Sequence, residues 1–273
     1  MGLLHCHRLL GCTLRHKQLQ HDEHLTLDCE HCSSEMDARF NDYVAAFRSR
    51  WNETSLFSGA SASESLFAPD DLGYTIKGEG GHDHIKGGEA NDILRGGSGD
   101  DWIEGFGGND TIFGGQGDDV VCGDSGNDFI KGKSGNDLIY GGSGFDILKG
   151  NSGDDILYGG DNSDILTGGR QNDILHGENG NDWLDGGTGA DRLIGGDGAD
   201  VFILSKGNDI IEDYSLLEDS KIRINADVFT EVSLSIGFVN GQETLSLIHN
   251  HCSTVLMGVD SSSFSIADNV SFT

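Results

Sequence analysis

The chain has 273 residues, a formal net charge of −29 and 43 glycines, but only one proline. This acidity argues against a nucleic-acid-binding protein, because nucleic-acid recognition needs a basic surface. No apolar run approaches the ~20 residues of a membrane-spanning helix, so we expect no membrane span.

Residues 1–34 form a tail that holds four of the six cysteines and six of the eleven histidines. Residues 29–32 read C-E-H-C, which is the C-x-x-C spacing of half a zinc site. The other half could come from Cys6 and Cys12 or from His21 and His24, although neither pair has a familiar spacing. The alternatives are a disordered tail and a start codon assigned too early. We expect disorder here.

Residues 35–71 are predicted to contain a helix followed by a linker. From Ser34 to Trp51, apolar and aromatic residues recur on one helical face, and Ser34 with Asp37 forms a plausible N-terminal cap. This aromatic stripe either covers the open end of the repeats that follow, as solenoids require, or binds a partner. Residues 52–71 contain several serines and the proline, a composition typical of a linker.

An aspartate recurs every nine residues across residues 78–212 without a slip in register, and an apolar residue stands two positions after each one. Glycine precedes the aspartate by five residues in every repeat except the last, which has Leu204. Glycine also precedes it by two residues, except at Ala90, Asn162 and Gln171. The fifteen aspartates are Asp83, Asp92, Asp101, Asp110, Asp119, Asp128, Asp137, Asp146, Asp155, Asp164, Asp173, Asp182, Asp191, Asp200 and Asp209.

The nine-residue unit, G-G-x-G-x-D-x-(apolar)-x, predicts a turn of six residues and a strand of three. The glycines allow positive φ angles that other residues resist, and they leave their carbonyl oxygens uncovered. The middle strand residue, such as Val121 or Ile130, is expected to point inward because strand side chains alternate between faces. Two units complete one coil, so alternate repeats are predicted to stack as two parallel sheets.

The unit resembles the RTX, or hemolysin-type, calcium-binding repeat, whose family has a parallel β-roll fold. The resemblance implies an all-β protein with a β-roll over residues 72–212, a short N-terminal helix and a C-terminal β cap. In the family, each calcium ion lies between neighbouring turns and is bound by aspartates and backbone carbonyls. All fifteen aspartates are therefore predicted calcium ligands, with carbonyls of turn residues such as Gly96, Gly114, Gly132, Gly141 and Gly150.

Fifteen turns offer at most about thirteen pairs of neighbouring turns, and therefore at most about thirteen calcium ions. The turn at Gln171 is predicted to bind calcium least well, because glutamine adopts positive φ angles poorly. A glycine-rich chain loses much entropy on ordering, and stacked carboxylates repel each other. We therefore expect the roll to fold only when calcium binds.

The two predicted sheets differ in the outward residue that ends each strand. One sheet carries Arg95, Phe113, Lys131 and Lys149 in successive coils, and the other carries Cys122, Tyr140, Tyr158 and His176. One interpretation is a groove for an acidic polysaccharide, with the tyrosines stacked on sugar rings. The other is charge relief and cross-strand packing. A cell-surface component is a further candidate partner.

Residues 213–273 are predicted to form the C-terminal β cap. Apolar residues alternate with polar ones from Val232 to Ile236, Asn240-Gly241 marks a tight hairpin, and residues 244–248 form the partner strand. The segment resembles the end of RTX modules of the serralysin and alginate-epimerase kind, which implies an export signal. The terminus reads V-S-F-T, and not the acidic and apolar tail that such a signal would have.

No H-E-x-x-H or G-x-S-x-G motif is present, so we expect no catalytic activity. The resemblance implies type I secretion, and modest calcium cages fill at millimolar calcium, which points outside the cytosol. The sequence therefore favours a secreted, extracellular calcium-binding module with a structural or adhesive role. The alternatives are a polysaccharide-binding module similar to those of alginate epimerases, and the C-terminal fragment of a larger RTX enzyme or toxin.

Overall fold

The computed structural model describes residues 56–68, 72–214, 220–224, 232–239, 242–249, 252–257 and 270–272. The Cys/His-rich tail, and the helix predicted between Ser34 and Trp51, lie outside these ranges. Every element of the described part is a β-strand. No helix in those ranges is long and apolar enough to cross a membrane.

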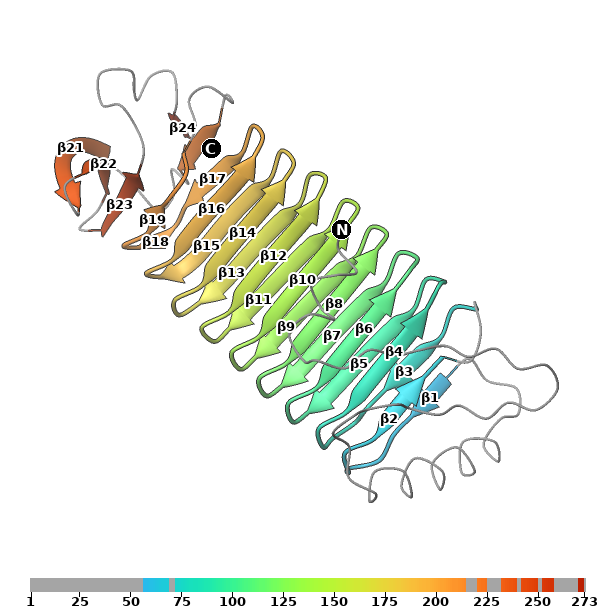
Figure 1. The fold of residues 1–273 in the computed structure, drawn as a ribbon. Helices are drawn as coiled ribbons and strands as arrows, with labels where there is room; N and C mark the ends of the chain where they lie inside the picture. Colours follow the sequence, from blue (N-terminus) through green and yellow to red (C-terminus); the bar gives the residue numbers. More distant parts are fainter. Residues whose placement is uncertain are drawn as a thin grey trace, which may run out of the picture. The chain divides into compact units, whose positions relative to one another are not determined.

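The repeats alternate between two twelve-stranded sheets, as the eighteen-residue coil predicts (Figure 1). The first sheet contains β1 (Leu56–Ser58), β3 (Thr75–Lys77), β5 (Ile93–Ser98), β7 (Thr111–Gln116), β9 (Phe129–Ser134), β11 (Ile147–Ser152), β13 (Ile165–Arg170), β15 (Trp183–Gly189), β17 (Val201–Leu204), β20 (Lys221–Ile224) and β24 (Val270–Phe272), with β18 (Lys206–Gly207) beside β15. The second contains β2 (Ser65–Phe67), β4 (His84–Gly88), β6 (Trp102–Phe106), β8 (Val120–Ser125), β10 (Leu138–Ser143), β12 (Ile156–Asp161), β14 (Ile174–Asn179), β16 (Arg192–Asp197), β19 (Ile210–Ile211), β23 (Cys252–Met257), β22 (Gln242–His249) and β21 (Val232–Val239).

The core is one column of aliphatic side chains from each sheet. Strands pair in parallel with partners eighteen residues apart, so that Ile112 lies beside Ile130 and Ile139 beside Leu157. The middle residue of each repeat strand is 0–1% exposed, from Ile85 to Ile211. Burial of each such side chain contributes about 1.5–3 kcal/mol. The expected all-β parallel roll and its inward-facing residues are therefore confirmed.

The stack begins earlier than the sequence analysis predicts. Residues 56–68 were expected to belong to a linker, but β1 and β2 form a coil that pairs in parallel with β3 and β4. This coil lacks the repeat's aspartate, and its apolar residues Phe57 and Leu66 are nine residues apart. That spacing is the sequence signal of the extra coil; the next step, from Leu66 to Ile76, is ten residues and breaks the register.

The other end of the roll is an antiparallel meander. β21 and β22 pair across residues 240–241, with Val239 opposite Gln242, which agrees with the predicted hairpin. β22 then pairs with β23, which adds to the second sheet beside β19. Near the last repeat, both carboxylate oxygens of Asp213 accept backbone N–H groups, from Gly195 and Gly196. These bonds occupy turn groups that a further repeat would otherwise cover.

Candidate metal centres

The fifteen repeat aspartates are all buried at the turn edges of the roll, with exposures of 0–3%. In each one, Oδ1 accepts a backbone N–H from the neighbouring coil on its N-terminal side. Asp119 Oδ1, for example, accepts from Asp101 N at 2.8 Å, and Asp137 Oδ1 accepts from Asp119 N at 2.9 Å. The aspartates therefore form continuous ladders in which each carboxylate ties its own coil to the one before it.

The second oxygen of these carboxylates has no such partner. Within the described part of the chain, Oδ2 is buried and accepts no hydrogen bond in thirteen of the fifteen aspartates, from Asp83 through Asp191. A buried carboxylate oxygen without a partner carries a large desolvation cost. Its repetition along the stack indicates that a cation belongs beside these atoms.

Glycine at the first position of the repeat keeps the space beside Oδ2 open. A Cβ on Gly114 would lie closer than 3.0 Å both to Asp119 Oδ2 and to the carbonyl oxygen of Gly132 in the next coil. The same pair of oxygens surrounds Gly96, where they belong to Asp101 and Gly114. Each cradle thus combines a carboxylate oxygen and a peptide carbonyl, which are the hard ligands that Ca²⁺ prefers.

The other two glycines of the repeat are needed for the turn itself. The second and fourth positions adopt positive φ, as at Gly97 (123°) and Gly99 (112°). Six non-glycine residues adopt positive φ at the second position, and Asn162 (79°) and Gln171 (74°) do so at the fourth. The Gln171 turn therefore keeps the conformation of its neighbours, and its predicted weakness as a calcium site stays a prediction.

Burial raises the pKa of most of these carboxyl groups. Desolvation, together with the charges of neighbouring aspartates, raises the pKa of Asp119 to about 7 and those of Asp110 and Asp137 to about 8. The backbone hydrogen bond to Oδ1 lowers the pKa of the Asp119 carboxyl group, but by less than burial raises it. Without a cation, these carboxylates in the folded roll therefore take up a proton at a higher pH than exposed aspartates do.

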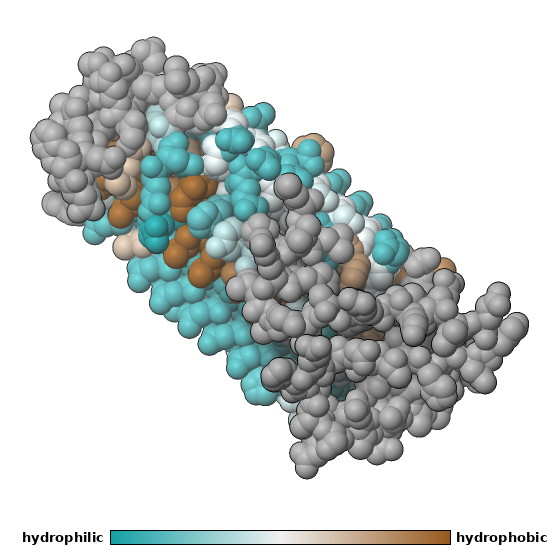
Figure 2. Space-filling model, viewed as in Figure 1, coloured by the Kyte–Doolittle hydropathy of each residue, from teal (hydrophilic) through white to brown (hydrophobic). Residues whose placement is uncertain are grey.

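A second ladder, which the sequence analysis missed, runs along the outside of each turn edge. Where the residue before the repeat aspartate is polar, its side chain accepts a backbone N–H from the following coil, the reverse of the aspartate ladder. Asp118 Oδ1 accepts from Asn136 N at 2.7 Å, and Asn109 Oδ1 from Asn127 N at 2.8 Å. The sequence does carry a signal for this second ladder, since asparagine or aspartate precedes the repeat aspartate in most repeats. Figure 2 shows hydrophilic residues gathered along one edge of the repeats.

The predicted ligand residues thus lie close together along the turn edges. Of the five predicted carbonyl ligands, those of Gly96, Gly114, Gly132 and Gly141 face an Oδ2 of the preceding coil, whereas the placement of the Gly150 carbonyl stays a prediction. No group of three or more His, Cys, Asp or Glu side chains that could hold a metal occurs in the described ranges. Any ion here would therefore depend on backbone oxygens for much of its coordination, and the ligand roles remain predictions.

The two outward ladders lie on different sheets. Arg95 and Lys131 extend from the first sheet, whereas Tyr140, Tyr158 and His176 stack on the second, with ring centroids 4.9 and 4.7 Å apart. This placement on alternate sheets is the one that the sequence predicts, and the binding of an acidic polysaccharide stays a prediction. The two faces have to be considered separately.

The match to a family model agrees with this repeat architecture. The model of the RTX calcium-binding nonapeptide repeat matches residues 75–103, 87–121, 123–144, 140–175 and 176–211, about half of the chain. No curated protein sequence matches. Among solved structures, the AlgE6R3 subunit of the Azotobacter vinelandii mannuronan C5-epimerase is similar, with 27% identity, a TM-score of 0.37, and coverage of 47% of this chain and 80% of that one.

The extracellular lipase LipA from Serratia marcescens is also similar, at 18% identity and a TM-score of 0.28. The alignment covers 67% of this chain but only 40% of the lipase. The repeat family is established by the match across the nonapeptides and by the two stacked parallel sheets that they form. The chain is an RTX calcium-binding repeat protein with a parallel β-roll.

Proposed function

We propose that this chain is a secreted, extracellular module whose roll folds when calcium fills the turn edges, and whose role is structural or adhesive. The observation that supports this most is the set of thirteen buried Oδ2 atoms without a hydrogen-bond partner. A cation beside each would offset the desolvation cost and the repulsion between stacked carboxylates. Their number equals the upper limit of about thirteen ions that neighbouring turns allow.

The extracellular assignment is supported by the kind of site. Cages of carboxylate and carbonyl oxygens on extracellular modules commonly bind calcium at 10⁻⁴–10⁻³ M, a concentration reached outside cells. We assign the repeat aspartates no catalytic role, because their two oxygens already serve the hydrogen-bonded ladder and the cation cradle. Secretion and the absence of catalysis are both parts of this proposal.

Calcium titration of the full chain, followed by circular dichroism, tests the proposal. We expect little β signal in EGTA at pH 8 and a cooperative rise with a midpoint near millimolar calcium. Magnesium at the same concentration is the control, since Mg²⁺ demands a more rigid octahedral site and should not replace calcium. A β signal that does not change between EGTA and calcium would refute folding on calcium.

A further inference from the structure

The outer face of the first sheet is cationic over five neighbouring strands. We call the outward side chains of β3, β5, β7, β9 and β11 the cationic face. Their sequences, T-I-K, I-L-R-G-G-S, T-I-F-G-G-Q, F-I-K-G-K-S and I-L-K-G-N-S, contain five basic residues and no acidic one. The basic residues are Lys77, Arg95, Lys131, Lys133 and Lys149. In a chain with a net charge of −29, this is a marked local reversal of charge.

These cations form no ion pair among the described residues. Within the described ranges, the ion pairs involve His82, His84, Lys86 and Arg192, and none involves the cationic face. The nearest acidic residue in sequence is Glu79, just after β3, and it accepts a hydrogen bond from Ser58 Oγ at 3.1 Å. The face therefore keeps its positive charge available for a ligand.

Aromatic rings hold the cationic groups in place without cancelling their charge. Arg95 Cζ lies 4.6 Å and Lys133 Nζ lies 5.1 Å from the centroid of the Phe113 ring, and Lys131 Nζ lies 4.9 Å from that of Phe129. Such cation–π contacts order a long side chain while leaving its charge intact. Less side-chain entropy is then lost when an anion binds.

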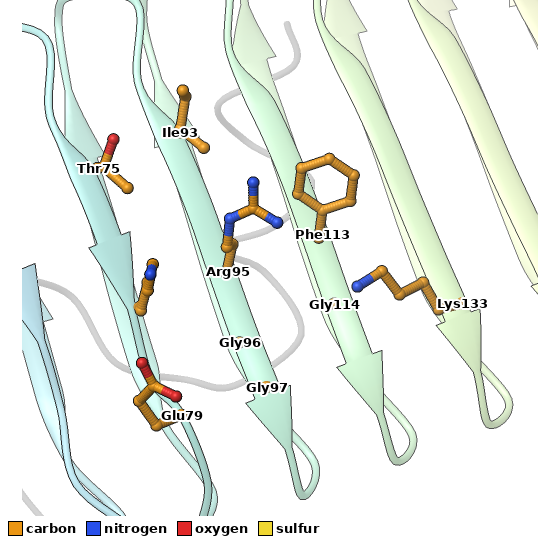
Figure 3. A pocket seen from close by; sticks show the side chains of 10 residues that line it. Thr75, Glu79, Ile93, Arg95, Gly96, Gly97, Phe113, Gly114 and Lys133 are labelled. Carbon is orange, nitrogen blue, oxygen red and sulfur yellow. The ribbon is translucent and has the colours of Figure 1, made fainter.

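The face is also hollowed. A cavity of about 490 Å³ opens over β3, β5, β7 and β9, and its charged lining consists of three basic residues, Lys77, Arg95 and Lys133, and one acidic residue, Glu79. Figure 3 shows the Arg95 and Lys133 side chains extending toward Phe113 from opposite sides, with Thr75 and Ile93 along the same surface. The outward column Thr75, Ile93, Thr111, Phe129 and Ile147 runs directly beside the basic column. Hydroxyl and apolar side chains thus accompany the cations along the whole face.

We propose that the cationic face binds a linear polysaccharide that carries carboxylate groups. The five strands span four spacings of ~4.8 Å, or roughly 19 Å, so the face is a strip suited to a polymer lying across the strands. Carboxylates would pair with the basic column, and the ring C–H faces and hydroxyls of the sugars would contact the neighbouring column. The proposal rests on the proposed function, because only the calcium-folded roll brings these strands together.

A single-stranded nucleic acid is the other polyanion to consider, and the face suits it less well. Bases bind such surfaces by stacking on open aromatic rings, whereas the Phe113 ring is already contacted by Arg95 and Lys133. A densely charged phosphate polymer would also be repelled by the rest of this acidic chain.

Binding of the polysaccharide should raise the apparent calcium affinity, since coupling between two ligands is reciprocal.

The test uses the full chain in excess calcium and a fluorescently labelled short oligogalacturonate, with binding read by fluorescence anisotropy. We expect saturable binding that weakens as salt is added, and no binding of a neutral oligosaccharide of equal length. The variant Arg95→Gln with Lys131→Gln should bind at least about tenfold more weakly. The second variant is Lys133→Gln alone, at an exposed residue. It removes one charge and should weaken binding by a smaller factor.

The matched control is Arg192→Gln with Lys206→Gln, which removes the same charge from β16 of the second sheet and from β18 beside β15, away from the cationic face, and should leave binding unchanged. Circular dichroism in calcium monitors the fold of every variant. A calcium-folded wild type that does not bind the oligomer overturns this inference alone, whereas a chain that does not fold on calcium overturns the proposed function and this inference together. Equal weakening in the face and control variants, or equally tight binding of a single-stranded DNA oligomer, would also overturn it.

Discussion

Replacement of Asp119 by asparagine should have opposite effects on the metal-free and the calcium-loaded roll. Asp119 is 1% exposed, its Oδ1 accepts a backbone N–H, and its Oδ2 has no partner among the described residues. Burial raises its pKa from 3.8 to about 7. At pH 8 the charged carboxylate therefore destabilises the metal-free roll by about 4 kcal/mol, at about 1.4 kcal/mol per pKa unit. Asparagine removes this cost but leaves calcium one charged ligand short.

Asp118→Asn is the matched control. Asp118 is adjacent in sequence and accepts the same kind of backbone hydrogen bond, from Asn136 N at 2.7 Å, but it is exposed. The charge change is the same in both variants, and an asparagine Oδ1 can accept either bond. Any difference between the two variants therefore reports the buried Oδ2 position and not the net charge.

Two circular dichroism titrations measure the two effects. In EGTA at pH 8, trimethylamine oxide favours the compact state, and Asp119→Asn should fold at a lower concentration of it than Asp118→Asn. In a calcium titration the order should reverse, with Asp119→Asn needing more calcium. The reasoning would be refuted if the two variants behaved alike in both titrations.

Three further predictions concern pH and the turn residues. Burial raises the pKa values of Asp110 and Asp137 in the folded roll to about 8. Protonation of these carboxyl groups therefore favours the folded state, so acidification from pH 8 to pH 5 should increase the β signal in EGTA. A flat pH profile would contradict this. Gly114→Ala places a methyl group between two cradle oxygens and should lower the number of calcium ions bound in equilibrium dialysis. Gln171→Gly relieves a positive φ of 74° and should raise the free energy of unfolding in calcium by about 1 kcal/mol, measured in urea, whereas no gain would show that the turn is unstrained.

The Asp119 and Asp118 pair shows what a sequence pattern can and cannot assign. The nine-residue period marks Asp119 as a ligand candidate, because it repeats without a slip. The period does not show that Oδ1 is already used by the backbone of the preceding coil, which leaves only Oδ2 for a cation. That division depends on coil-to-coil hydrogen bonds between residues eighteen apart, and no local pattern encodes their direction.

The extra coil at the N-terminal side has a similar explanation. Phe57 and Leu66 pack in register with the repeats, but with Glu64 in place of the aspartate and Gly59 as its one glycine the segment looks like a linker. Stacking on an existing sheet edge is enough to order such a strand, because the edge supplies its backbone hydrogen bonds. The edge comes from the folded neighbours β3 and β4, so a reading of this segment by itself misses the coil.

The sequence by itself determined the coil length, the parallel stacking and the inward column from Ile85 to Ile211, because a strict period leaves one arrangement that buries every apolar residue. Only the tertiary structure decided which surface residues act together. It brought Arg95 and Lys133, which are 38 positions apart, against the Phe113 ring, and it placed Lys77 in the lining of the same cavity. The physical reason is that stacking adds neighbours every eighteen residues on one face, while the core between the sheets keeps the two faces apart.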